Sequence, residues 1–192
     1  MKHLSLIIIC VIAASCQKSN WTDTERNLIE SHTTVMRILT VDNPADSLVL
    51  REKSTTLSKA EIQSKLYQSL AKKMIATVTS QQNAVGIAGP QIGITRRVVA
   101  VQRFDKAGEP FEVYPNIYIT AMRGTKEKGP EGCLSVPNQR GDVMRYTDID
   151  ISYTSPTTLK DTTETVKGFS AVIFQHETDH LDGILYTDKL AQ

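Results

Sequence analysis

The spacing of apolar side chains predicts a chain that mixes helices and strands. Between Leu57 and Val78 apolar residues recur at four-residue steps, and Ser58 and Glu61 have capping-box spacing, so one amphipathic helix is expected there. A second helix is predicted from about Ser170 to Gly183. The expected strands are RVVAVQRF, FEVYPNIYIT and DIDISYTS, and the expected turns are DKAGEP, RGTKEKGP and SPTTLKDTTET. We therefore predict an α+β fold with mainly antiparallel pairing.

Composition narrows the class of protein. The chain has 192 residues, of which 40% are hydrophobic and 22% charged, so it can form one compact domain with its own core. A net charge of +1 gives no electrostatic basis for binding nucleic acid. We expect a small or peptidic partner.

The first 15 residues have the pattern of an export signal. Lys2 gives a positive start, an apolar run follows, and small residues precede Cys16. The segment IAASC resembles the lipobox of bacterial lipoproteins, although Ala13 stands where leucine is usual. This resemblance implies lipidation of Cys16, a tether over residues 16–34 and a catalytic domain over 35–192. It also implies a bacterial protein anchored to a membrane outside the cytoplasm, in the periplasm or on the outer-membrane face. Ordinary secretion and an uncleaved anchor remain alternatives.

The cysteine count excludes a disulfide within the domain. Of three cysteines, Cys10 lies in the signal, Cys16 is the candidate lipid site, and Cys133 alone belongs to the folded part. A single thiol in an exported domain is a buried spectator or a ligand.

The segment QHETDH near the end of the chain carries the candidate chemistry. On a helix, His176 and His180 lie one turn apart on one face and can reach the same metal ion, with Glu177 beside them as a general base. His3 and His32 lie in the signal and the expected tether, where no role is indicated.

A catalytic site of this kind requires a third protein ligand. Downstream of the motif, Tyr186 occupies the position where the longer metzincin pattern has its third histidine, so that pattern fails. The ligand must come from upstream, and Cys133 in GPEGCLSVP is the natural candidate. A thiolate with two imidazoles suits zinc or ferrous iron.

Three segments together resemble the peptide deformylase family: AVGIAGPQ, EGCLS and QHETDH, in that order. The similarity covers most of Val35 to Leu190. It implies a single α+β domain in which antiparallel sheets pack around a C-terminal metal-binding helix. It also implies a monomer that removes the formyl group from N-formylmethionyl peptides, with Fe²⁺ as the usual ion and Zn²⁺ as the alternative.

The resemblance also assigns roles to individual residues. Cys133, His176 and His180 would hold the metal, and Glu177 would activate its water. The oxyanion would be stabilised by the metal, the Gln91 side chain and the backbone N–H of Leu134. Substrate contacts would come from Val85, Gly86, Glu131, Arg140, Phe169, Val172 and Ile173. Val85 and Gly86 would pair with the peptide backbone as an added strand.

Some features depart from the family pattern. Ala84 replaces the first glycine of the first motif, and Gly89 stands where alanine is usual. The export signal is the larger departure, since it separates the enzyme from nascent chains and favours released formyl peptides as substrates. Two rival functions remain open: a secreted metallopeptidase, and a catalytically silent lipoprotein that binds formylated peptides. Glu177 argues against the second, because a binder needs no general base.

Overall fold

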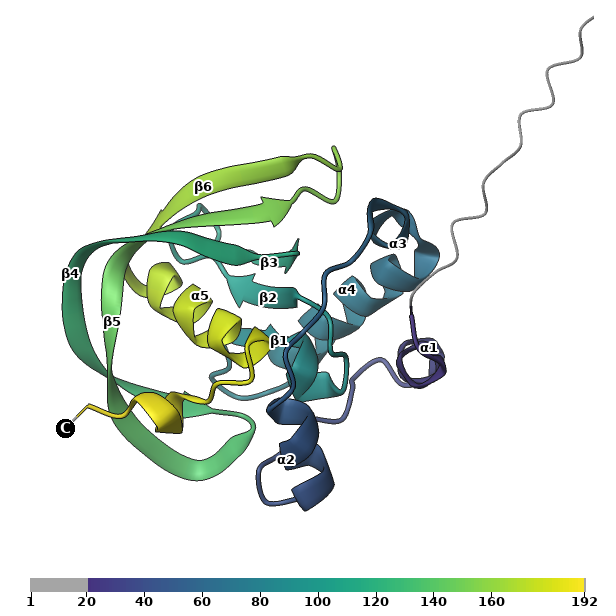
Figure 1. The fold of residues 1–192 in the computed structure, drawn as a ribbon, viewed down its shortest axis with the longest axis horizontal. Helices are drawn as coiled ribbons and strands as arrows, with labels where there is room; N and C mark the ends of the chain where they lie inside the picture. The colour runs from purple at the N-terminus through teal and green to yellow at the C-terminus, as the bar shows by residue number, and fades with distance from the viewer. Residues whose placement is uncertain (1–20, 192) are drawn as a thin grey trace, which may run out of the picture.

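Two antiparallel sheets and a C-terminal helix form the centre of the computed structural model, which describes residues 21–191 (Figure 1). The first sheet is β1 (Gly86–Ala88), β2 (Val98–Gln102) and β3 (Phe111–Pro115); the second is β4 (Tyr118–Cys133), β5 (Val136–Thr154) and β6 (Asp161–Lys167). The helices are α1 (Asp23–Glu30), α2 (Pro44–Leu50), α3 (Lys59–Gln63), α4 (Lys65–Thr79) and α5 (Gly168–Leu181), with short 3-10 helices η1 (Gly89–Ile92) and η2 (Tyr186–Lys189). The predicted α+β class and antiparallel pairing are confirmed.

Helix α5 joins the two sheets through a shared apolar core. Phe174 of α5 is fully buried and meets the ring of Tyr114 from β3 edge-on, with centroids 4.9 Å apart. The same cluster includes Val101 of β2 and Ile149 of β5. Each of these four side chains is almost fully buried, so the position of α5 is fixed from both sides.

The polar side of α5 is fixed by one glutamine. Gln175 accepts a hydrogen bond from the backbone N–H of Tyr146 and donates one to the carbonyl of the same residue. The amide thus replaces the neighbouring strand that β5 lacks at this point. The expected stop after the helix is also present: Gly183 has φ of +71°, and a Cβ there would lie 2.3 Å from the carbonyl oxygen of Arg51.

The predicted single helix from Leu57 to Val78 is wrong in one respect, because the structure divides it. Ser58 and Glu61 form the expected capping box, but Ser64 then takes an extended conformation with ψ of 153°. Its hydroxyl accepts from the N–H of Tyr67, so Ser64 ends α3 and caps α4. Apolar spacing continues through the break, which is why periodicity alone did not reveal it.

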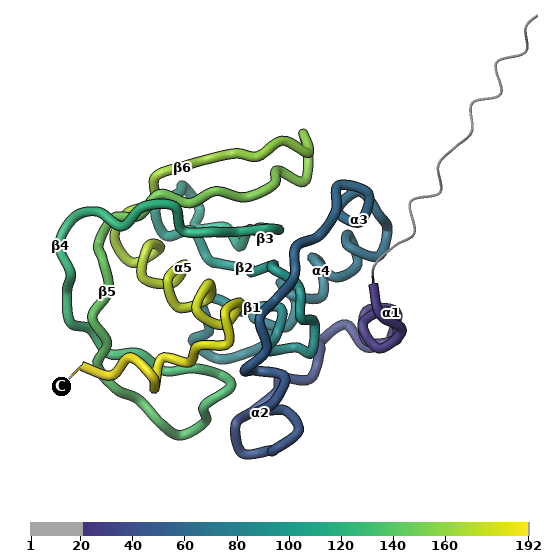
Figure 2. Tube along the Cα trace, viewed as in Figure 1, coloured from purple at the N-terminus to yellow at the C-terminus, as the bar shows by residue number. Residues whose placement is uncertain are grey.

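Three of the predicted strand and turn boundaries are also wrong. The end of SPTTLKDTTET, expected as a turn, forms most of β6. FEVYPNIYIT is divided between β3 and β4 at Asn116, whose φ is +57°. RGTKEKGP, expected as a turn, lies within β4, where the pairing with β5 shifts register between Arg123 and Lys126. Gly124 sits at this bulge with positive φ, so its turn-like composition serves an irregular strand. Figure 2 shows that the β4–β5 hairpin curls around α5, and the C-terminal segment returns beside β5 at Val143.

The described part of the expected tether is folded onto the domain. Trp21, just before α1, and Ile29, within α1, are 5% and 0% exposed and belong to the same core cluster as Ile92. Glu25 of α1 forms two hydrogen bonds of 2.9 Å with Arg96. The expectation of a tether over residues 16–34 is therefore wrong for residues 21–30. Cys16 and the signal segment lie outside the described residues, and within residues 21–191 no helix has the length and apolarity needed to cross a bilayer.

Candidate active site

The structure brings the three candidate metal ligands together from two elements. His176 and His180 project from α5, and Cys133 lies at the end of β4, where the hairpin turns into β5. The ligand atoms of the three residues all lie within 4.8 Å of one another, and Cys133 Sγ is 3.2 Å from His180 Nε2. The prediction that the third ligand comes from upstream is thus consistent with the geometry.

The donor set fits a divalent metal ion. A thiolate and an imidazole that share a tetrahedral ion lie about 3.6 Å apart, close to the separation observed for Cys133 and His180. Burial lowers the pKa of His180 well below its usual value, so this ring is neutral and can act as a ligand. At His176 burial also acts to lower the pKa, but hydrogen bonds to Cys133 and Glu131 outweigh it and raise the pKa to about 10. The groups around the His176 ring, Cys133 and Glu131, therefore favour a positive charge there, and a bound divalent ion would supply one.

Glu131 lines the cavity but is bonded to His176, a candidate metal ligand, and to Arg145, so it is not free to bind substrate. Its Oε2 accepts a hydrogen bond of 2.7 Å from Nδ1 of His176. Arg145 donates to both of its oxygens, at 2.7 and 3.0 Å, and to Asp179 at 2.6 Å. Burial would raise the pKa of Glu131, but the bonds from His176 and Arg145 lower it to about 2. A charged carboxylate behind a ligating imidazole orients the ring and increases its basicity.

Sequence reasoning did not identify Arg145 and Asp179. Arg145 lies in no recognisable motif, and Asp179 lies within QHETDH at a position to which that motif assigns no role. Arg145 reaches Glu131 only because β4 and β5 pair across the hairpin. Tyr186, which occupies the position of the absent third histidine, stacks on the His176 ring at 6.1 Å between centroids. Arg145, Asp179 and Tyr186 thus lie around the candidate metal ligands but are not candidate ligands themselves.

Glu177 is held in a dry position beside the ligands. It is 4% exposed, and its Oε2 has no hydrogen-bond partner. Burial is the main reason that its pKa is raised to about 7. A Cβ at Gly86 of β1 would lie 2.4 Å from Glu177 Oε1, so the absence of a side chain at Gly86 gives the carboxylate its place.

Gln91 reaches the same point from η1. Its Oε1 accepts a hydrogen bond of 2.8 Å from the backbone N–H of Ala88, which fixes which way the amide faces. Its Nε2 donates to Cys133 Sγ at 3.4 Å and to Ser135 Oγ at 3.2 Å. The donor is therefore aimed at the metal ligands, and Leu134 lines the cavity beside it.

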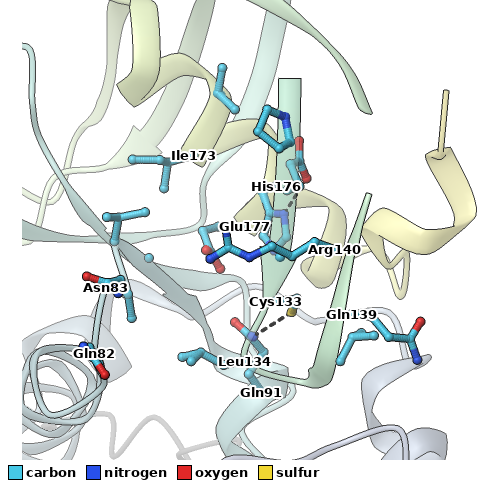
Figure 3. A pocket seen from close by; sticks show the side chains of 18 of the residues that line it. Gln82, Asn83, Gln91, Cys133, Leu134, Gln139, Arg140, Ile173, His176 and Glu177 are labelled. Carbon is cyan, nitrogen blue, oxygen red and sulfur yellow. Dashed lines mark hydrogen bonds and ion pairs between the residues drawn. The ribbon is translucent and has the colours of Figure 1, made fainter. Parts of the chain in front are cut away.

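A cavity of about 650 Å³ opens over these residues (Figure 3). It contains every residue that was predicted to contact substrate: Val85, Gly86, Glu131, Arg140, Phe169, Val172 and Ile173. Strand β1 is an edge of its sheet, pairing with β2 on one side only, so a peptide can pair along its other side. Phe169 is 55% exposed, whereas Ile173 is 4% exposed, which makes a pocket with an open outer wall and an apolar floor.

Two imidazoles and a thiolate whose ligand atoms lie within 4.8 Å of one another, beside a buried carboxylate, are the arrangement of a metal-dependent hydrolase. Comparison with known proteins gives the same class of enzyme. The family model for polypeptide deformylase matches residues 35–192. A peptide deformylase of Leptospira biflexa is 35% identical over 163 residues, covering 81% of this chain and 88% of the relative. The chain belongs to the polypeptide deformylase family.

Solved structures give the same result for the fold. A peptide deformylase from Thermotoga maritima aligns with a TM-score of 0.71 at 28% identity, covering 82% of this chain and 99% of that one. A class I type b peptide deformylase from Acinetobacter baumannii, solved with Met-Ala-Ser bound, aligns with a TM-score of 0.71 at 31% identity. That alignment covers 81% of this chain and 98% of the other.

Proposed function

We propose that this protein removes the formyl group from N-formylmethionyl peptides and releases formate. The observation that carries this proposal is the position of Glu177, buried and next to the cluster of Cys133, His176 and His180. A carboxylate at this place can take a proton from an attacking water and later give it to the departing amine. Its raised pKa, about 7, suits both transfers near neutral pH.

Cys133, His176 and His180 would hold one Fe²⁺ or Zn²⁺ ion. When bound, such an ion lowers the pKa of water and polarises the formyl oxygen. Glu131 and Arg145 keep His176 oriented for this purpose.

Charge on the formyl oxygen would be met by two donors of the chain. The Nε2 group of Gln91 points at the ligand cluster, and the N–H of Leu134 follows Cys133 directly. Such donors stabilise charge that develops only in the transition state, and loss of one costs about 100-fold or more in rate.

The peptide would lie along β1, with Val85 and Gly86 pairing with its backbone and with Phe169, Val172 and Ile173 around the methionine side chain. The cavity has the size of sites that bind small ligands, which favours a short segment of peptide. The related Acinetobacter enzyme was solved with Met-Ala-Ser, a peptide of this size.

Formate release tests the proposal. The metal-loaded full chain is assayed with formyl-Met-Ala-Ser beside Glu177→Gln, which keeps the shape of the side chain but cannot accept a proton. We expect release from the unaltered chain and a loss of at least 100-fold in the variant, with metal content unchanged. Equal rates would refute the role of Glu177, and cleavage of unblocked peptides would indicate a metallopeptidase instead. Binding without any release would indicate the silent binding lipoprotein.

We further propose that the enzyme acts outside the cytoplasm as a monomeric lipoprotein anchored through Cys16. The support for this proposal is the leader pattern that ends in IAASC. It comes from the sequence alone, because these residues lie outside the described part of the chain. Its substrates there would be released formyl peptides. Fractionation and mass analysis of the mature N-terminus test this: a cytoplasmic chain without lipid on Cys16 would contradict the proposal. Sedimentation of the detergent-solubilised chain tests the monomer.

A further inference from the structure

The rim of the cavity is unusual in its charge. Four carboxamides besides Gln91 line the cavity: Gln82, Asn83, Asn138 and Gln139. The acids among the lining residues are Glu131 and Glu177, which are 8% and 4% exposed and belong to the catalytic cluster. Arg140 is the one arginine or lysine among the lining residues, all of which lie in the described part of the chain, and His176 belongs to the ligand cluster below. The entrance is therefore polar, free of exposed carboxylates and positively charged.

Arg140 is placed at this rim by the hairpin. It pairs with Gly132 of β4, the residue before Cys133. Its Cγ and Nε lie 3.5 and 3.7 Å from the point where a Cβ of Gly132 would be, so the stem of the arginine rests on the backbone beside the metal ligand. Figure 3 shows the side chain extending over the cavity.

The guanidinium of Arg140 has no ion-pair partner among residues 21–191, although the structure contains many paired arginines. Arg140 is exposed, so its charge costs little to maintain in the free protein. A neutral donor would suffice to bind a backbone carbonyl, whereas a full charge and a forked set of donors match a carboxylate. The carboxamides around Arg140 are neutral, so they do not weaken its preference for a carboxylate.

We propose that Arg140 selects peptides with a carboxylate close to the formylated methionine. This inference rests on the proposed deformylase function and names its substrate class. The carboxylate has two sources: the free C-terminus of a peptide of two or three residues, or an acidic side chain in a longer one. A free C-terminus this close to the formyl group occurs in released fragments and is absent from a nascent chain.

Three peptides distinguish these sources: formyl-Met-Ala-Ser as the free acid, the same peptide as its C-terminal amide, and formyl-Met-Ala-Glu as the amide. Each is assayed with the metal-loaded full chain, with Arg140→Gln and with Arg140→Lys. Arg123→Gln is the matched control, because Arg123 is exposed but pairs with Asp150 outside the cavity.

We expect KM for the free acid to be about two- to fivefold lower than for the amide, the range that an exposed ion pair gives. The kcat values should agree, because the contact is present equally in the ground and transition states. The preference should disappear in Arg140→Gln, persist in part in Arg140→Lys, remain in Arg123→Gln, and weaken with added salt. A preference for the Glu peptide alone would identify a side-chain carboxylate as the source.

Binding of the deformylated peptide separates failure of this inference from failure of the proposed function. Calorimetry with Met-Ala-Ser, as acid and as amide, needs no turnover. Tighter binding of the acid than of the amide, without formate release, would support the carboxylate site and refute the proposed deformylase function. Formate release with equal KM values for all three peptides, or a preference that survives Arg140→Gln, would overturn the inference.

Discussion

Replacing Gly86 with alanine tests whether Glu177 is placed for catalysis by β1. Gly86 is buried in β1, where it pairs with Val101 of β2. An added Cβ would meet Glu177 Oε1 at 2.4 Å and its Cγ and Cδ at 2.9 Å. Since ordinary contact begins at 3.4 Å, the carboxylate or the strand has to retreat by about 1 Å.

The surroundings decide which of the two moves. Strand β1 is tied to β2 by backbone pairing, and the carbonyl of Val85 also accepts from the N–H of Gln102 at 2.8 Å. The Glu177 side chain has no hydrogen bond that holds its Oε2, so the carboxylate gives way first. A displacement of about 1 Å at a reacting group costs about 100-fold in rate. We therefore expect kcat to fall by about that factor while KM changes little.

The assay is formate release with metal content measured on the same samples. Gly129→Ala is the control, because no atom lies within 4 Å of the added Cβ and its backbone is not left-handed. Both variants should retain the metal, as neither touches Cys133 or the histidines. A Gly86→Ala enzyme with full metal and a rate within threefold of the unaltered chain would refute the assignment of Glu177 as the proton-transfer group.

Three other changes test the supporting structure. Glu131→Gln should lower metal affinity by about 10- to 100-fold in a chelator competition, and unchanged affinity would contradict a supporting role. Glu25→Gln gives buried Arg96 a neutral partner and should cost about 3 kcal/mol in urea unfolding; a loss near zero would show that α1 is not part of the core. The hydrogen bond from Arg103 lowers the pKa of Asp105 from 3.8 to about 2, so its stabilisation is present above pH 4 and lost as the pH falls toward 2. Asp105→Asn should thus cost roughly 2 kcal/mol at pH 7 and much less at pH 2, measured by unfolding at both values.

Local signals in the sequence located one helix start, one helix stop and the three residues that the structure groups as candidate metal ligands. The capping box at Ser58 and the helix stop at Gly183 depend only on residues close together in the sequence, so local residue patterns are enough to predict them. His176 and His180 share a face because of helical spacing alone. Cys133 could be identified because the downstream segment offered no ligand, and the hairpin then delivers it to α5.

Features that depend on long-range pairing could not be predicted in the same way. Arg145 of β5 meets Glu131 of β4 across the curled hairpin, although the register sets Arg145 opposite Glu127, and no local pattern records this contact. The break at Ser64 was hidden because the apolar spacing runs through it. RGTKEKGP has the composition of a turn but is paired over most of its length, because a bulge accommodates Gly124 and Gly129 pairs regularly with Val143.

The departure at Gly89 becomes understandable from the turn that follows it. A Cβ there would lie 2.5 Å from the carbonyl oxygen of Ile94 and 2.8 Å from that of Arg96. The N–H of Ile94 bonds to the carbonyl of Gly89, so the segment folds tightly back on itself. Alanine at this position would require the turn to open, and the turn carries Gln91 on one side and packs against α1 on the other, where Leu28 approaches Gly93. The N-terminal helix and Gln91 thus share one closed turn, and the folded unit includes Trp21, which lies upstream of Val35, where the family match starts.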